Sequence, residues 1–239
     1  MLLIHGSAAD HTTWTMQAPL AASLELVTYD RRGSGAAPPA PAGYRVEDHA
    51  ADAATLIEEE LGGGPVLVCG SSFGAVVALE LARTRPALVR GVVLCEPPMP
   101  CADDLAAMPQ AFGCLFDALV AARGGEAGGA FFLQLVLGPA YDQMPPRFQV
   151  RAAGEWRAIR ADCLALQRYR PRYRELGAVT APALLVAGER SIGHFDATLD
   201  SLSLHLPDAR LVTLPRAGHM MQAERFRLFN QHLAEFAGI

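Results

Sequence analysis

The chain has 239 residues, of which 51% are hydrophobic and 19% are charged, and its formal net charge is −5. This length and apolar content predict one domain with a large core and room for an inserted lobe. The acidic balance and the lack of a basic run argue against a nucleic-acid partner. No apolar stretch reaches the length of a membrane span, so we expect no membrane partner either.

The N-terminus and the cysteines indicate the compartment. Residues 1–4 are apolar and lead directly into His5-Gly6 without a basic segment or a cleavage site, so we expect no secretory signal peptide. The five cysteines are an odd number without regular spacing, which favours free thiols. We therefore expect a cytoplasmic protein with reduced cysteines.

Short apolar runs alternate with helical patterns along most of the chain. Strands are predicted at residues 2–5, 25–29, 66–69, 91–95, 183–187 and 210–214. Helices are predicted at residues 46–61, 76–82 and 197–206, and in a closing segment that carries Phe226, Phe229, Leu233 and Phe236 on one face. This alternation predicts an α/β fold with a mostly parallel sheet of about six strands, covered on both faces.

The pattern changes between residues 97 and 179. Helical stretches are expected at residues 105–122, 128–137 and 155–167, and no β-rich run occurs. A segment of this length is too long for a loop. We therefore predict a helical cap at residues 97–179 over the carboxyl edge of the sheet, and a core made of residues 1–96 and 180–239.

One serine lies in a turn that suits a nucleophile. Ser72 is the centre of Gly70-Ser71-Ser72-Phe73-Gly74, between the apolar strand and a helical run. The two glycines fit a turn so sharp that a Cβ at either position would collide with the strand or the helix. The Ser72 hydroxyl would then project above the sheet, and the Phe73 N–H would point to where an oxyanion forms. The alternative is an ordinary turn between a strand and a helix.

Four motifs, taken together, resemble the α/β-hydrolase superfamily over nearly the whole chain. In order they are His5-Gly6, the turn Asp30-Arg31-Arg32-Gly33-Ser34-Gly35, the serine turn, and Gly218-His219 after the last strand. The resemblance implies an α/β-hydrolase fold with backbone N–H groups of Ser7 and Phe73 in an oxyanion hole. His219 is the best general base, because the other histidines lie on helices or in other loops. The charged residues of the turn at 30–35 are expected to tie loops together.

The chain departs from that family in two places. It begins at what is usually the third strand, so the strand at residues 25–29 is predicted at an edge of the sheet. Such an edge invites pairing, which favours either a homodimer or cover from the proline-rich loop after Gly35. The second departure is Ser191, which stands three residues after Gly188 where the family usually has an aspartate. A hydroxyl cannot balance the charge of an imidazolium.

The triad acid must then come from elsewhere. Glu96 ends the strand that follows the nucleophile strand, whereas Asp196 and Asp200 lie in or after the usual acid loop. The chain resembles the zearalenone-type lactonases here, with a Glu-x-Pro after that strand and no aspartate in the later loop. A glutamate is long enough to reach across one strand spacing of about 4.8 Å. We favour Glu96 and keep Asp196, or no acid at all, as alternatives.

These residues predict a serine hydrolase, without a cofactor or metal, for a carboxylic ester or lactone of a fairly hydrophobic small molecule. The alternatives are a receptor or slow-turnover binder on the same fold, a thioesterase, or a C–C bond hydrolase. A dinucleotide enzyme is disfavoured because the serine turn lacks the Gly-x-Gly-x-x-Gly spacing. The residues expected to line an apolar substrate pocket are Met99, Phe112, Phe116, Phe132, Trp156 and Met220.

Overall fold

A computed structural model describes residues 1–103 and 105–239 of the chain. Its centre is one six-stranded sheet in the order β2-β1-β3-β4-β5-β6, in which every pair of neighbours is parallel. The predicted fold class is thus confirmed. The strands are β1 (Leu2–Ile4), β2 (Val27–Thr28), β3 (Val66–Ser71), β4 (Val89–Cys95), β5 (Ala183–Gly188) and β6 (Ala209–Leu214).

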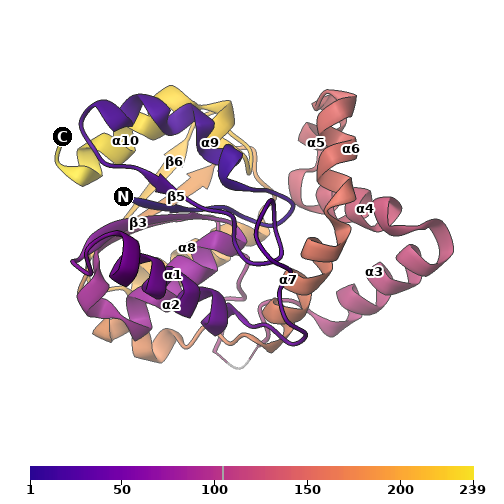
Figure 1. Ribbon diagram of the computed structural model, residues 1–239, viewed down its shortest axis with the longest axis horizontal. Helices are drawn as coiled ribbons and strands as arrows, with labels where there is room; N and C mark the ends of the chain where they lie inside the picture. The colour runs from indigo at the N-terminus through magenta and orange to yellow at the C-terminus, as the bar shows by residue number, and fades with distance from the viewer. Residues whose placement is uncertain (104) are drawn as a thin grey trace.

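Helices cover both faces of this sheet (Figure 1). The alternation of side chains along β3 shows why, since Val68 joins the apolar core on one face and Leu67 and Cys69 join the core on the other. The first face is covered by α1 (Val46–Glu60), α2 (Phe73–Thr84) and α8 (His194–His205). The second face is covered by the 3₁₀ helix η1 (His11–Ala22), α9 (Met221–Glu224) and α10 (Phe226–Ala237). The short η2 (Pro86–Leu88) leads into β4.

We call residues 97–179 the helical segment, and its helices at residues 110–168 stand to one side of the sheet, away from both termini (Figure 1). Some of its aromatic and aliphatic side chains form a separate small core around Phe116, Phe132 and Ile159. Others, such as Tyr169 and Leu176, join the core on the first face of the sheet. The sequence predicts three helices here, and the structure adds two short ones that each begin with a proline. The described elements are α3 (Gln110–Arg123), α4 (Gly125–Leu137), α5 (Pro139–Gln143), α6 (Pro146–Gly154), α7 (Trp156–Arg168) and η3 (Tyr173–Ala178).

All five cysteines are free, and Cys69 and Cys95 are buried in the strands where the sequence places them. Among the helices of residues 1–103 and 105–239, none is both long and apolar enough to cross a bilayer.

The strand β2 lies at an edge of the sheet and pairs only with β1, as predicted. The Val27 N–H donates to the Met1 carbonyl at 2.9 Å, so the Thr28 N–H faces the free side of the edge. Self-association through β2 and cover from the proline-rich loop both predict slow hydrogen exchange at Thr28. Protection of the Thr28 amide from exchange that increases with protein concentration would indicate the dimer. A monomer in which the Thr28 amide exchanges freely would exclude both arrangements.

Candidate active site

Ser72 occupies a strained turn between β3 and α2. Its backbone has φ 54 and ψ −122, a left-handed conformation that a residue with a side chain seldom adopts. Glycine is required on both sides, because a Cβ at Gly70 would overlap the Gly74 carbonyl and a Cβ at Gly74 would overlap the carbonyl oxygen of Ile4. The turn therefore has the close packing that a nucleophile elbow needs.

Ser72 and Glu96 leave the sheet from neighbouring strands in register. Ser71 at the end of β3 is paired with Cys95 at the end of β4, and the Ser72 N–H donates to the Cys95 carbonyl at 2.8 Å. The residue directly after β4 is Glu96, whose φ of 44 is also left-handed. One hydrogen-bonded ladder thus fixes the separation of these two residues.

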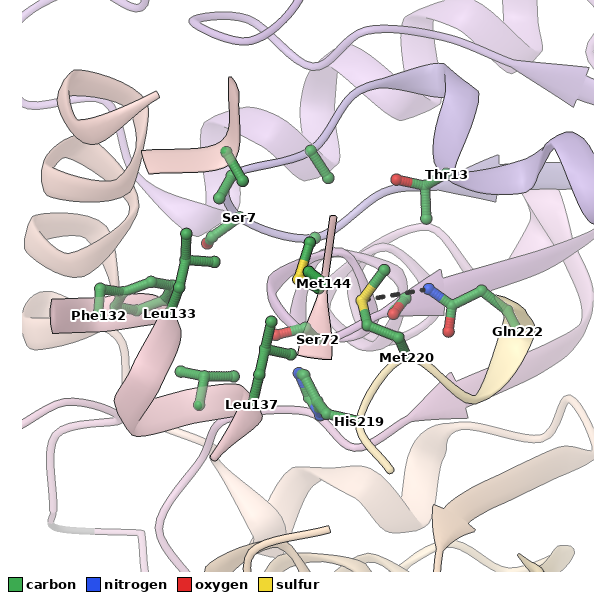
Figure 2. Close-up of a pocket in the computed structure, with 16 residues that line it drawn as sticks. Ser7, Thr13, Ser72, Phe132, Leu133, Leu137, Met144, His219, Met220 and Gln222 are labelled. Atoms are coloured by element: carbon green, nitrogen blue, oxygen red, sulfur yellow. Dashed lines mark hydrogen bonds between the residues drawn. The ribbon is translucent and has the colours of Figure 1, made fainter. Parts of the chain in front are cut away.

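The carboxylate of Glu96 contacts the ring of His219. The distance from His219 Nδ1 to Glu96 Oε2 is 2.6 Å, and the two side chains are 5% and 1% exposed. His219 Nε2, on the other side of the ring, is buried and has no hydrogen-bond partner among the described residues. Figure 2 shows the ring beside the Ser72 side chain, with both residues lining one cavity. Phe195 stacks flat on the ring, with centroids 4.6 Å apart and 7° between the planes.

Among the described hydrogen bonds, the others that the Glu96 carboxylate accepts come from β5 and the loop after it, where the family usually carries the acid. The Gly188 N–H donates to Oε1 at 2.7 Å, and the Ser191 hydroxyl donates to Oε2 at 2.9 Å. Ser191 therefore lies in the loop where the sequence places it, and its hydroxyl contacts the Glu96 carboxylate. The alternative acid, Asp196, is exposed at the start of α8 and makes no contact with His219 in the described hydrogen bonds.

Two backbone N–H groups at the carboxyl edge of the sheet are the candidate oxyanion donors. Phe73 is the first residue of α2, where an N–H has no partner within the helix. Ser7 follows β1, which is the strand next to β3. Among the described backbone hydrogen bonds, neither the Phe73 N–H nor the Ser7 N–H has an acceptor. Both donors are thus available at the carboxyl edge of the sheet.

Asp30 ties two loops together, as expected. Its carboxylate accepts hydrogen bonds from the backbone N–H groups of His11 and Ala36, both at 2.8 Å. Partial burial raises the pKa of Asp30, but these bonds outweigh it and lower the pKa to about 2. Asp10, His11 and Asp30 are close enough to hold a metal ion, but existing bonds account for the group, since Asp10 caps η1 and pairs with Arg151.

Two cavities meet at Ser72. The larger has a volume of about 690 Å³ and lies between the helical segment and α8; the smaller, about 90 Å³, lies on the side of His219. Both are lined by Ser7, Ser72, Phe132 and Val136. The large cavity adds mainly apolar groups, among them Met99, Leu105, Ala106, Met108, Phe112, Leu135, Leu166, His194 and Phe195. The small cavity adds Gly6, Thr13, Leu133, Leu137, Met144, Ala152, His219, Met220 and Gln222.

The structure brings some of the predicted pocket residues to these cavities and leaves others away from them. Met99 and Phe112 line the large cavity, Met220 lines the small one, and Phe132 lines both. Phe116 and Trp156 line neither. Phe116 is fully buried in the core of the helical segment, and Trp156 packs against that core. Aromatic content alone could not separate these two uses.

Other contributors were not predicted. Phe195 supports the His219 ring, and Thr13 and Gln222 provide polar groups to the small cavity. Their positions depend on how the loops pack, for which the sequence carries no local pattern. Asp162, which accepts a hydrogen bond from the Ser7 hydroxyl at 2.7 Å, could have been noticed, because it interrupts the otherwise apolar buried face of α7.

The profile of the alpha/beta hydrolase family matches residues 1–232. The chain belongs to this family and is an enzyme of the α/β-hydrolase type. The 2-(acetamidomethylene)succinate hydrolase of Mesorhizobium japonicum is 29% identical over 234 residues, covering 92% of this chain and 81% of that protein. Among solved structures, a hydrolase from Pseudomonas aeruginosa has a TM-score of 0.85 at 24% identity, with 100% and 89% covered. An enol-lactonase from Burkholderia xenovorans has a TM-score of 0.83 at 22% identity, and the match covers 100% of this chain and 90% of that one.

Proposed function

We propose that this chain is a serine hydrolase that cleaves a neutral, apolar carboxylic ester or lactone through an acyl-enzyme. The observation that carries the proposal is the contact of 2.6 Å between Glu96 and His219 Nδ1, which leaves Nε2 free on the side of Ser72. A carboxylate at Nδ1 holds the imidazole in the tautomer that accepts a proton at Nε2. The three residues therefore have the roles of acid, base and nucleophile.

The reaction then proceeds in two halves. His219 Nε2 takes the Ser72 proton as Oγ attacks the substrate carbonyl, and the buried Glu96 carboxylate stabilises the imidazolium. His219 next donates the proton to the leaving oxygen, and the acyl group remains on Ser72. Water attacks this ester with His219 as base, which releases the acid and restores the Ser72 hydroxyl. No cofactor is needed for any of these steps.

The negative oxygen of each tetrahedral intermediate is stabilised by the N–H groups of Ser7 and Phe73. Such a donor contributes about 3–4 kcal/mol when it is fixed in place before the reaction. The positive end of the α2 dipole lies at the same point and adds to the effect.

The cavities favour a neutral substrate. Among the described residues that line them there is no lysine, arginine, aspartate or glutamate. An ionised carboxylate on the substrate would lose its hydration there without gaining a counter-charge. The succinate in the name of the Mesorhizobium relative is therefore a poor guide to the substrate of this chain.

The two cavities divide the substrate at its carbonyl. His219 must protonate the leaving oxygen, and it lines the small cavity and not the large one. The leaving alcohol accordingly enters the cavity of about 90 Å³, well below the roughly 300 Å³ of an ordinary small-molecule site. The acyl group enters the cavity of about 690 Å³.

Two series of unactivated esters test this assignment. From methyl acetate to methyl decanoate, kcat/KM should rise about fourfold per methylene until the cavity is full, because each buried methylene contributes about 0.8 kcal/mol. From methyl acetate to decyl acetate, kcat/KM should fall. Ala106→Phe should lower kcat/KM for methyl decanoate at least ~10-fold and leave methyl acetate nearly unchanged. Ala152→Phe, on the small cavity, is the matched variant and should discriminate against longer alcohols.

The outcomes separate the alternatives. A preference for long alcohols over long acyl groups would reverse the assignment of the cavities. A burst of product without steady turnover would indicate a slow-turnover binder instead. Hydrolysis of thioesters in preference to the matched oxygen esters would favour a thioesterase.

A further inference from the structure

We infer that Asp162, on α7 of the helical segment, is a positioning residue that holds both halves of the oxyanion hole through Arg31. The inference rests on the proposed function, since it assigns a supporting role in the same site. Arg31 and Asp162 are 131 residues apart in sequence and lie on opposite sides of the boundary between the core and the helical segment.

Arg31 fixes the backbone that carries the first donor. Its guanidinium donates from Nε to the His5 carbonyl at 3.0 Å and from Nη2 to the Gly6 carbonyl at 3.1 Å. The Arg31 N–H also donates to His5 Nε2 at 2.9 Å. Burial, followed by the nearby Arg31 charge, lowers the pKa of His5 to about 3, so the ring stays neutral and accepts this bond. The Ser7 N–H comes immediately after the two carbonyls that Arg31 holds.

The same guanidinium contacts the second donor residue. Its central carbon lies 4.4 Å from the centre of the Phe73 ring, a cation–π arrangement. Phe73 is fully buried, and its N–H begins α2. One rigid planar group thus touches the residues on both sides of the oxyanion position, which a lysine at this place could not do.

Asp162 sets the orientation of that guanidinium. Its two carboxylate oxygens accept from Nη1 at 3.1 Å and from Nη2 at 2.8 Å, and Oδ2 also accepts from the Ser7 hydroxyl at 2.7 Å. Burial raises the pKa of Asp162, but the Arg31 charge and these bonds outweigh it and hold the pKa below its usual value. Asp162 therefore remains charged and contacts the oxyanion loop (residues 5–7) both directly and through Arg31.

Stability alone does not explain this pair. The Arg31 and Asp162 side chains are 0% and 6% exposed, and a buried ion pair is often no more stabilising than apolar side chains of the same volume. The pair does provide a fixed direction for the Ser7 backbone. A displacement of about 1 Å in such a group can lower a rate about 100-fold. Asp162 thereby links the position of the helical segment to the position of the oxyanion loop.

The test uses Asp162→Asn and Ser7→Ala in the full chain. Ser7→Ala keeps the backbone N–H and the ion pair, so it remains informative if the buried Arg31 charge prevents Asp162→Asn from folding. We expect kcat for methyl butyrate to fall about 10- to 100-fold in Asp162→Asn and about tenfold in Ser7→Ala, with KM within about twofold. The affinity for an alkylboronic acid, which mimics the tetrahedral intermediate, should fall in parallel.

A second buried network serves as the matched control. Glu80, whose side chain is 0% exposed, pairs with Arg83 and Arg172 and accepts from the Tyr169 hydroxyl, so it also joins the core to residues of the helical segment. Glu80→Gln should lower the Tm and leave kcat unchanged.

The outcomes are distinct. If Asp162→Asn and Ser7→Ala only lower the Tm, as Glu80→Gln does, and kcat stays within about twofold, the positioning role is wrong while the hydrolase stands. If the unmodified chain turns over no ester and binds no boronic acid, the proposed function and this inference both fall. Loss of kcat with unchanged boronic acid affinity would also overturn the inference, because the oxyanion hole would then be intact.

Discussion

Replacing Ser72 by alanine is expected to lower kcat by about 10⁶ and to abolish labelling by a fluorophosphonate probe. The reason is that the probe and the ester both require an oxygen nucleophile above the end of β3, and Ser72 lies there with its backbone at φ 54. Alanine retains the Cβ, so the elbow and the fold should persist. Probe labelling resolved by mass spectrometry and steady-state rates with a short ester measure the effect.

The control is Ser203→Ala, which removes an exposed hydroxyl on α8 and should change neither labelling nor rate. Circular dichroism of both variants shows whether the fold is kept. Persistent labelling of the Ser72→Ala protein would place the nucleophile elsewhere in the chain.

Glu96→Gln should be the second most damaging change, with a loss of roughly 10⁴-fold in kcat and little loss of stability. The amide is nearly the same size as the carboxylate and can still accept from the Gly188 N–H. Facing His219 Nδ1, however, it no longer balances the imidazolium and favours the wrong tautomer. Asp196→Asn, at an exposed residue, should change kcat less than about tenfold. The reverse order of these two effects would move the acid to the later loop.

A double variant gives an independent check on the acid. The Ser191 hydroxyl lies 2.9 Å from Glu96 Oε2, so an aspartate at position 191 would bring a carboxylate toward the same side of His219. In the Glu96→Gln background, Ser191→Asp should recover part of the lost kcat. In the unmodified background, the same change places two carboxylates in one buried site and should lower activity. Failure to recover any activity would show that the position of the carboxylate, and not only its charge, is essential.

The sequence determined the sheet and the elbow because both depend on local patterns. Apolar runs marked all six strands, and Gly70 and Gly74 flank Ser72 in a five-residue motif that can be recognised between a strand and a helix. Glu96 was favoured as the acid because Ser191 stands where the family usually has an aspartate, and because the Glu-x-Pro after β4 resembles that of the zearalenone-type lactonases. In the structure, the register between β3 and β4 places Glu96 at the same edge as Ser72, where it contacts His219. The sequence alone gives only the order of the strands along the chain.

The parts that the sequence missed depend on tertiary packing. The strand β2 has two residues, fewer than its apolar run suggested, and η1 is a 3₁₀ helix that contains Pro19. The contact between Arg31 and Asp162 joins distant segments, so no local pattern predicts that these two residues pair. The division of the site into a large and a small cavity also depends on how the helical segment packs over the sheet.

The proposed place of the acid, at Glu96 directly after β4, has a consequence for protein engineering. In a family member whose acid lies in the loop after β5, mutagenesis of that loop risks moving the catalytic carboxylate. Here the loop at residues 189–193 contributes one contact to that charge, the Ser191 hydroxyl, and it leads directly into His194 and Phe195 at the wall of the large cavity. The ladder between β3 and β4 keeps Ser72 and Glu96 in register whatever this loop contains. A library that randomises residues 192 and 193, with Ser191 retained and with Glu189 and Arg190 kept because they bond to the segment before His219, is therefore expected to alter acyl specificity with little loss of turnover.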